Sequence, residues 1–413
     1  MSAQGTIEAV WRLEAPKLIA TLTRLTRDVG AAEDLAQDAL VAALELWPSE
    51  GIPRNPGAWL LTTARRRGID RLRRDAMAER KYVELGYDLQ EREATVPDME
   101  GALDTEIDDD LLRLIFIACH PVLPREAQVA LTLRLLGGLE TAEIARAFLV
   151  PEATVAQRIV RAKKALHGQA FELPAPGERA ARLGAVMAVV YLIFNEGHSA
   201  GSGAQLLRPA LCDESLRLAR QLQHLLPDEP EVHGLAALLE IQASRLPARL
   251  DARGRPVLLP DQDRRRWDRL LIQRGLEALA RAEALGEPGP YALQAAIAAC
   301  HARAARAADT DWGAIVAGYD RLLAINPSPV VALNRAVAIS FARGPAAAWP
   351  LLQALDAEPQ LRRYPFLAGA QADVLERLGR LTEARQAYLR AAELTENEAQ
   401  RGLLQERAAR LAS

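Results

Sequence analysis

Residues 141–166 have the sequence TAEIARAFLVPEATVAQRIVRAKKAL, which holds the strongest local pattern in the chain. The pattern predicts a short helix that Thr141 can cap, a tight turn at Pro151, and a second helix from Glu152. The small side chain of Ala145 lies where two helices must approach closely, as is typical of a helix-turn-helix.

The second helix of this motif has two distinct faces. Its inward stripe is expected to consist of Val155, Ile159, Ala162 and Leu166. Its outward face carries Thr154, Gln157, Arg158 and Arg161. Residues 152–167 have four basic side chains against one acidic side chain, a net charge of +3. Such a helix can enter the major groove of DNA, although an ordinary helical hairpin with a solvated basic face is the alternative.

A second basic helix is predicted for residues 59–75, which contain six arginines and two aspartates. Its apolar stripe comprises Leu60, Leu61, Ala64, Gly68 and Leu72. Arginines on the opposite face suit contact with phosphates and stacking on unpaired bases. A solvated charged face is again the simpler alternative.

The composition indicates an all-α protein. Half of the 413 residues are hydrophobic and a quarter are charged, so the chain is globular rather than disordered. Ala, Leu, Arg and Glu dominate, and these residues lose little side-chain freedom in helices. The three cysteines have no CxxC spacing and are expected to be reduced, as in a cytoplasmic protein. The longest apolar run, Leu183–Phe194, has 12 residues and is expected to form a buried helix rather than a membrane span.

The chain is expected to divide into four parts: residues 8–75, 76–110, 111–170 and 178–413. Residues 76–110 have 12 acidic and three basic side chains, a net charge of -9, and are predicted to be a linker. The next helix is expected to begin at Leu111, after a capping run of aspartates, and no strand is predicted. In the first part, the pair Asn55-Pro56 is expected to cap and start a helix.

The helix predicted over residues 32–47 is amphipathic. Leu35, Ala39, Ala43 and Leu46 form its apolar stripe. The opposite face carries Asp34, Gln37, Asp38, Val41 and Glu45.

Three segments resemble the sigma-70 family of transcription initiation factors. Residues 32–40, AEDLAQDAL, resemble the second conserved region of that family. Residues 55–74, NPGAWLLTTARRRGIDRLRR, are similar to the adjoining part that melts and reads the -10 promoter element. Residues 111–168 are similar to the fourth region, which reads the -35 element. The acidic segment in place of a third region is typical of the extracytoplasmic-function class.

The resemblance implies a role for each group of residues. The clamp of the polymerase β′ subunit would contact Asp34, Leu35, Gln37 and Asp38. The -10 element would be read by Trp59, Arg65, Arg66, Asp70, Arg71, Arg73 and Arg74. The -35 element would be read by Thr141, Thr154, Gln157, Arg158, Arg161, Lys163 and Lys164. Core RNA polymerase, through its β′ clamp and β flap, and promoter DNA are the expected partners. No catalytic residue, cofactor or metal is expected.

The part beyond residue 178 resembles a C-terminal extension of tetratricopeptide-like helices. Gly379, Ala384, Tyr388 and Ala391 have the spacing of such a repeat, and Gly344 lies 35 residues before Gly379. Stacked helical pairs form concave surfaces that usually bind a peptide or protein. His198 lacks a second histidine at metal-site spacing, so a hydrogen-bonding role at a helix end is favoured over catalysis.

The expected function is that of a sigma factor whose activity is modulated by its own C-terminal repeats. A helix-turn-helix regulator that works without polymerase is the first alternative. A purely scaffolding repeat protein is the second, although it would leave the basic helices without a role.

Overall fold

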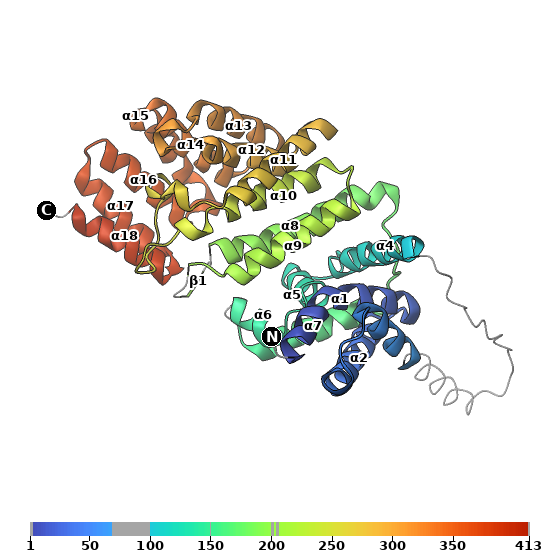
Figure 1. Ribbon diagram of the computed structural model, residues 1–413. Coiled ribbons are helices and arrows are strands. Elements are labelled where there is room, and N and C mark those ends of the chain that lie inside the picture. The colour runs from blue at the N-terminus through green and yellow to red at the C-terminus, as the bar shows by residue number, and fades with distance from the viewer. Residues whose placement is uncertain (1–2, 68–99, 149, 200–201, 204–205, 412–413) are drawn as a thin grey trace. The chain divides into compact units, whose positions relative to one another are not determined.

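The computed structural model describes residues 3–67, 100–148, 150–199, 202–203 and 206–411, and these residues are almost entirely helical (Figure 1). The chain forms two compact units, Met1–Val189 and Val190–Ser413. Within the described residues, the two strands β1 (Ser202–Gly203) and β2 (Glu396–Asn397) are short and pair in parallel. The predicted all-α fold is confirmed.

The described part of the N-terminal unit consists mainly of helices. It contains α1 (Ala3–Thr26), α2 (Val29–Glu50), a helix over residues 56–67, α4 (Glu100–Ala118), α5 (Arg125–Leu135), α6 (Thr141–Phe148), α7 (Glu152–Leu166) and the first part of α8 (Pro176–His198). The predicted cap at Asn55 is confirmed, because its side-chain oxygen accepts a 3.0 Å hydrogen bond from the N–H of Ala58.

Helix α2 packs through small side chains, with one departure from the expected stripe. Leu35, Ala39 and Ala43 are buried as predicted. The prediction of Leu46 as the next buried position is wrong, because Leu46 is 39% exposed and Trp47 is buried instead. A step of four residues from Ala43 keeps the indole on the same face, and that larger side chain fills the end of the core.

Helix α4 begins earlier than expected. The predicted start at Leu111 is wrong, because the helix begins at Glu100 and includes the last part of the acidic segment. Asp110 is 1% exposed rather than a solvated cap. It pairs with Arg24 of α1 at 3.0 Å and with Arg113 at 2.9 Å. Pairing with arginines therefore allows an acidic residue of this helix to be buried.

The helix-turn-helix is present where the sequence predicts it. Helices α6 and α7 are joined around Pro151, and Ala145 is buried beside the turn. The inward stripe of α7 is confirmed, since its members are all buried: Val155, Ile159, Ala162 and Leu166.

The C-terminal unit consists of successive helices stacked side by side (Figure 1). After the end of α8 come α9 (Pro209–Leu225), α10 (Pro230–Ala243), α11 (Arg269–Leu285), α12 (Pro290–Arg303), α13 (Trp312–Ile325), α14 (Pro329–Arg343), α15 (Pro345–Ala354), α16 (Pro365–Arg377), α17 (Leu381–Leu394) and α18 (Glu398–Arg410). Short 3-10 turns connect several of them: η1 (Leu246–Ala248), η2 (Leu259–Asp261), η3 (Arg264–Arg266), η4 (Ala307–Asp309), η5 (Leu355–Ala357) and η6 (Pro359–Leu361).

Residues with repeat-like spacing occupy equivalent structural positions in the last helices. Gly344 and Gly379 follow α14 and α16 with φ angles of 91° and 76°, a conformation that favours glycine. Ala384 and Tyr388 are buried on α17. The Tyr388 hydroxyl donates to a Glu376 carboxylate oxygen at 2.7 Å, which ties α17 to α16.

Helix α8 contains the apolar run of residues 183–194. By length and composition alone, Gly177–His198 could cross a membrane, and 44% of its most apolar window is buried inside the protein. Val189, Ile193 and Phe194 are at most 1% exposed, so the expected buried helix is confirmed. The three cysteines are free, and Cys119 and Cys212 are buried.

His301 makes the stability of the C-terminal unit depend on pH. Burial, together with nearby Arg245 and Arg264, lowers its pKa to about 4. The unfolded chain therefore binds a proton between about pH 6.5 and 4 that the folded chain does not bind. Lowering the pH from about 7 to about 5 should cost about 2 kcal/mol of unfolding free energy at this residue.

Urea denaturation at the two pH values measures this loss. The variant His301→Gln should lose less stability on acidification, whereas His224→Gln, at an exposed position, should behave like the unaltered chain. An identical pH response of His301→Gln and the unaltered chain would contradict the assignment.

Candidate nucleic-acid interface

Helix α7 presents a polar, basic face away from its buried stripe. Gln157, Arg161 and Lys164 are exposed, while Thr154 and Arg158 are half-buried. Thr141 is half-buried at the start of α6. The structure thus brings most of the residues expected at the -35 element onto one helix with side chains available to a ligand.

Lys163 differs from the other basic residues expected at the -35 element, because it forms an ion pair with α2 of the same unit. Its Nζ lies 2.5 Å from a carboxylate oxygen of Glu33 in α2, and Arg134 Nε of α5 lies 2.6 Å from the other. Glu33 is only 4% exposed. Burial alone would raise the pKa of Glu33, but Lys163 and Arg134 bring it below its ordinary value.

A second polar contact joins the same two helices. Asp28 caps α2 by accepting from the N–H of Ala31 at 2.8 Å. Its other carboxylate oxygen lies 2.8 Å from Nδ1 of His167, directly after α7. Burial opposes ionisation of Asp28, but these hydrogen bonds lower its pKa overall. The start of α2 and the end of α7 are therefore held together by two acidic residues.

Sequence reasoning missed Glu33 as a site residue. The signal was available, because Glu33 lies between Ala32 and Ala36, which are both buried. A carboxylate among buried alanines requires a cation, but the sequence does not say that the cations come from α5 and α7.

The acidic face of α2 is exposed at the surface of the N-terminal unit. Asp34 and Asp38 are exposed, and Gln37 is half-buried with its amide donating to Glu33 at 3.1 Å. Leu35 does not belong to this face, because it is 2% exposed and packs in the core. The residues expected at the polymerase thus separate into three surface side chains and one core side chain.

Apolar side chains accompany these carboxylates on α2. Val41 and Leu44 are large hydrophobic residues exposed at the surface. They line a cavity of about 780 Å³ that also contacts Gln37 of α2 and Thr141 of α6. Exposed apolar residues rimmed by charges are typical of a protein-binding surface.

The helix over residues 56–67 carries the first of the residues expected at the -10 element. Trp59 is half-buried and packs edge-on against Trp47, with ring centroids 5.3 Å apart. Arg65 and Arg66 are exposed. The remaining expected residues lie outside the described part of the chain: Asp70, Arg71, Arg73 and Arg74.

Arg67 connects this helix to the acidic face of α2. Its guanidinium donates to the backbone carbonyl of Asp38 at 2.7 Å. The sequence pattern had not singled out this arginine, because a contact 29 residues along the chain has no local signature. The arrangement can bind phosphates and unpaired bases beside a carboxylate-bearing protein surface.

Comparison with known proteins identifies the two regions of the N-terminal unit. Residues 10–77 match Sigma-70 region 2, and residues 113–166 match Sigma-70 region 4. Residues 182–283 match a family of unknown function, DUF6596. An uncharacterized protein of Rhizobium meliloti (strain 1021) is 45% identical over 401 residues, which cover 96% of this chain and 94% of that protein. The N-terminal unit therefore carries two regions of the sigma-70 family, and these matches support a sigma factor role in transcription initiation.

Proposed function

We propose that this protein binds core RNA polymerase through α2 and directs initiation at promoters by reading their -10 and -35 elements. The observation that carries the proposal is the combination of surfaces in the N-terminal unit. An acidic and partly apolar face on α2 accompanies a basic face on the helix over residues 56–67 and another on α7. A protein-binding face beside two basic faces suits a factor that connects an enzyme to DNA.

Each surface has a proposed partner. Asp34, Gln37 and Asp38 contact the β′ clamp of the polymerase, and the region around α5–α7 also contacts the β flap. Trp59 and the following arginines hold the melted -10 strand. The outer face of α7 enters the major groove at -35. The acidic composition of residues 76–110 supports membership in the extracytoplasmic-function class, and the proposed site of action is the cytoplasm.

Run-off transcription with core polymerase and the purified chain tests this proposal. A transcript from a genomic promoter library that requires both components is the expected result. DNA binding to a palindrome without polymerase, and no transcript with it, would instead favour a conventional helix-turn-helix regulator.

Two substitutions on α7 separate base reading from phosphate contact. Gln157→Ala should change which base is preferred at one -35 position, by about 1–3 kcal/mol, because an amide reads base edges. Lys164→Ala should weaken all promoters alike and reduce the salt dependence of binding by about one phosphate contact. Selection from a randomised -35 library, scored at two salt concentrations, measures both effects. Identical base preferences in the two variants would contradict a base-reading role for Gln157.

The contact at Glu33 must open for both elements to be read together. The element names place them about 25 base pairs apart, roughly 85 Å along B-DNA. In the free chain, however, Lys163 of α7 lies 2.5 Å from Glu33 of α2. We propose that the pairs of Glu33 hold the free protein in a closed arrangement that competes with polymerase binding.

Substitutions at two neighbouring acidic residues test this competition. Glu33→Gln should raise the affinity for core polymerase by about threefold to tenfold, because it weakens the closed contact. Asp34→Asn should lower that affinity, since its carboxylate faces outward. Fluorescence anisotropy with labelled chains measures both, with circular dichroism as the check on folding. Reduced polymerase affinity in a folded Glu33→Gln variant would refute the closed arrangement.

We also propose that the C-terminal unit is a tetratricopeptide-like module that modulates the activity of the N-terminal unit and binds a ligand. The buried small and aromatic residues of α17 and the glycine turns after α14 and α16 support this assignment. Its stacked helical pairs resemble a binding scaffold rather than an enzyme.

Truncation after Val189 tests modulation. This cut preserves the hydrogen bonds of Arg182 to the Phe116 carbonyl at 2.9 Å and of Arg125 to the Ala185 carbonyl at 3.3 Å, which attach α8 to the N-terminal unit. Transcription by residues 1–189 should differ from that of the full chain. A silent truncation would mean that the tail is required, and a more active one that it restrains. Equal activity would contradict modulation.

A further inference from the structure

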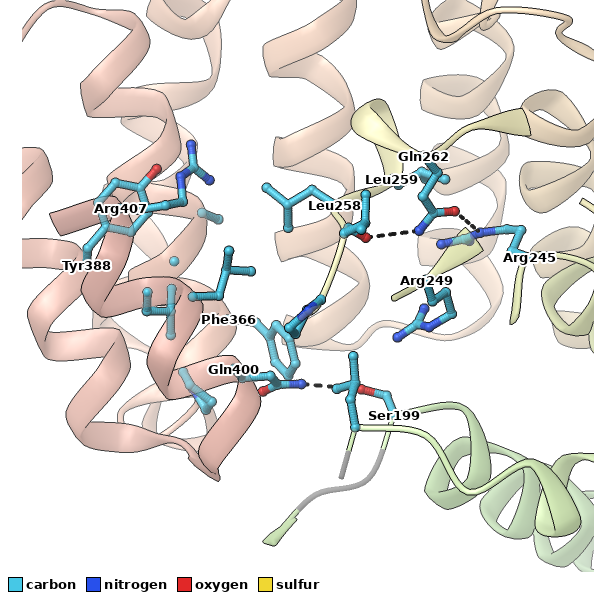
Figure 2. Close-up of a pocket in the computed structure, with 18 residues that line it drawn as sticks. Ser199, Arg245, Arg249, Leu258, Leu259, Gln262, Phe366, Tyr388, Gln400 and Arg407 are labelled. Atoms are coloured by element: carbon cyan, nitrogen blue, oxygen red, sulfur yellow. Dashed lines mark hydrogen bonds between the residues drawn. The ribbon is translucent and has the colours of Figure 1, made fainter. Parts of the chain in front are cut away.

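The C-terminal unit contains a cavity of about 310 Å³ beside the loop that follows α10. Residues 256–259 of this loop form one wall, and Phe366 of α16 and Leu404 of α18 contribute to the other. Arg245 and Arg249 line the cavity as well, and Figure 2 shows Arg245 extending toward Gln262, with Arg249 beside it. The cavity therefore has apolar walls and a cationic end.

Neither of these two arginines has a carboxylate oxygen within 4.0 Å among the described residues. Arg245 donates only to the neutral side chains of Gln242 at 2.8 Å and Gln262 at 3.4 Å. Arg249 donates to Nε2 of His198 at 3.1 Å, and its own Nε is buried without a hydrogen-bond partner in the described structure. The local hydrogen bonds thus leave two positive charges uncompensated.

Another arginine in the same cavity provides the contrast. Arg407 pairs with Asp373 at 3.1 Å and with Glu376 at 3.0 Å, and it lies over the Tyr388 ring. Carboxylates outside the cavity lining therefore neutralise Arg407, but no carboxylate pairs with Arg245 or Arg249 among the described residues. The distribution of charge within the cavity is asymmetric.

The pKa values of both arginines are lowered in this arrangement. Burial, and then the proximity of Arg249 and Arg264, lowers the pKa of Arg245 to about 9. Burial lowers the pKa of Arg249 to about 10. Burial and the same arginines keep the pKa of His198 well below its usual range, so its ring is neutral and accepts from Arg249. The expected hydrogen-bonding role of His198 is confirmed.

Local structure compensates these charges only in part. Arg245 directly follows the C-terminal end of α10, where the helix dipole favours a cation by about 0.3–1 kcal/mol. Both arginines are half-buried, so the dipole offsets only part of the cost of removing their charges from water without an acidic partner. An anion bound between the two guanidinium groups would remove the imbalance, since arginine forks match carboxylate oxygens in geometry.

We propose that this cavity binds a small carboxylic acid with an apolar chain. The carboxylate contacts Arg245 and Arg249, and the chain lies against Leu258, Leu259 and Phe366. A volume of about 310 Å³ is at the small end of the range for small-molecule sites, which favours a compact ligand over a folded partner. Ser199 and Gln400, joined by a 3.4 Å hydrogen bond, add neutral polar groups at the cavity edge.

Calorimetric titration of the full chain with octanoate tests the proposal, with octanamide as the uncharged probe of the same chain length. Octanoate should bind, and octanamide should bind at least about tenfold more weakly, because only octanoate offers a charge to the arginines. Arg249→Gln should weaken octanoate binding by at least about tenfold, whereas Arg249→Lys, which keeps the charge, should weaken it less.

Arg253→Gln is the matched control, because Arg253 belongs to the same loop and is exposed. It should bind octanoate like the unaltered chain, and circular dichroism checks that each variant is folded. Equal affinity for octanoate and octanamide, equal binding by folded Arg249→Gln and the unaltered chain, or no binding at millimolar octanoate would each overturn the proposal. Binding of a peptide with a C-terminal leucine in place of octanoate would also overturn it, in favour of a peptide terminus.

Discussion

The ion pairs of Glu33 with Arg134 and Lys163 connect the two sigma regions of the N-terminal unit. Glu33 is buried among the alanines of α2. An unpaired carboxylate there would cost several kcal/mol of folding free energy, so its cationic partners must remain close. Those cations come from α5 and α7, the helices of the other region. A single buried carboxylate therefore links the surface proposed for polymerase to the helix proposed for DNA. Any state in which the two surfaces act at separate places must replace these pairs with other contacts.

Charge compensation also distinguishes two sites, one in each unit. In the N-terminal unit, buried acids such as Glu33 and Asp110 each have basic partners at 2.5–3.0 Å. In the C-terminal unit, Arg245 and Arg249 have only neutral hydrogen-bond partners within the described residues. In the first arrangement the buried acids are neutralised by residues of the same unit, so these ion pairs can hold its helices together. The second remains electrostatically incomplete, which is a property of sites that accept a ligand.

Local patterns predicted the helices and their buried faces well where the period of the side chains was unambiguous. The stripe of α7 and the cap at Asn55 both follow from spacing alone. Leu46 was misplaced because two apolar residues, Leu46 and Trp47, compete for the same face, and only packing selects the larger. The start of α4 was misplaced because acidic composition suggested a solvated chain, while Asp110 is in fact paired inside the fold.

The sequence by itself determined that the chain is helical, that it has two basic faces, and that it has a helix-turn-helix between residues 141 and 166. These properties depend on composition and on intervals of three or four residues, which a helix reproduces wherever it packs. Only the tertiary structure decided which distant charges meet. Arg134 lies 101 residues from Glu33, and the cavity at Arg249 is closed by helices more than a hundred residues later. Such encounters depend on how whole helices pack, and no local interval in the sequence encodes them.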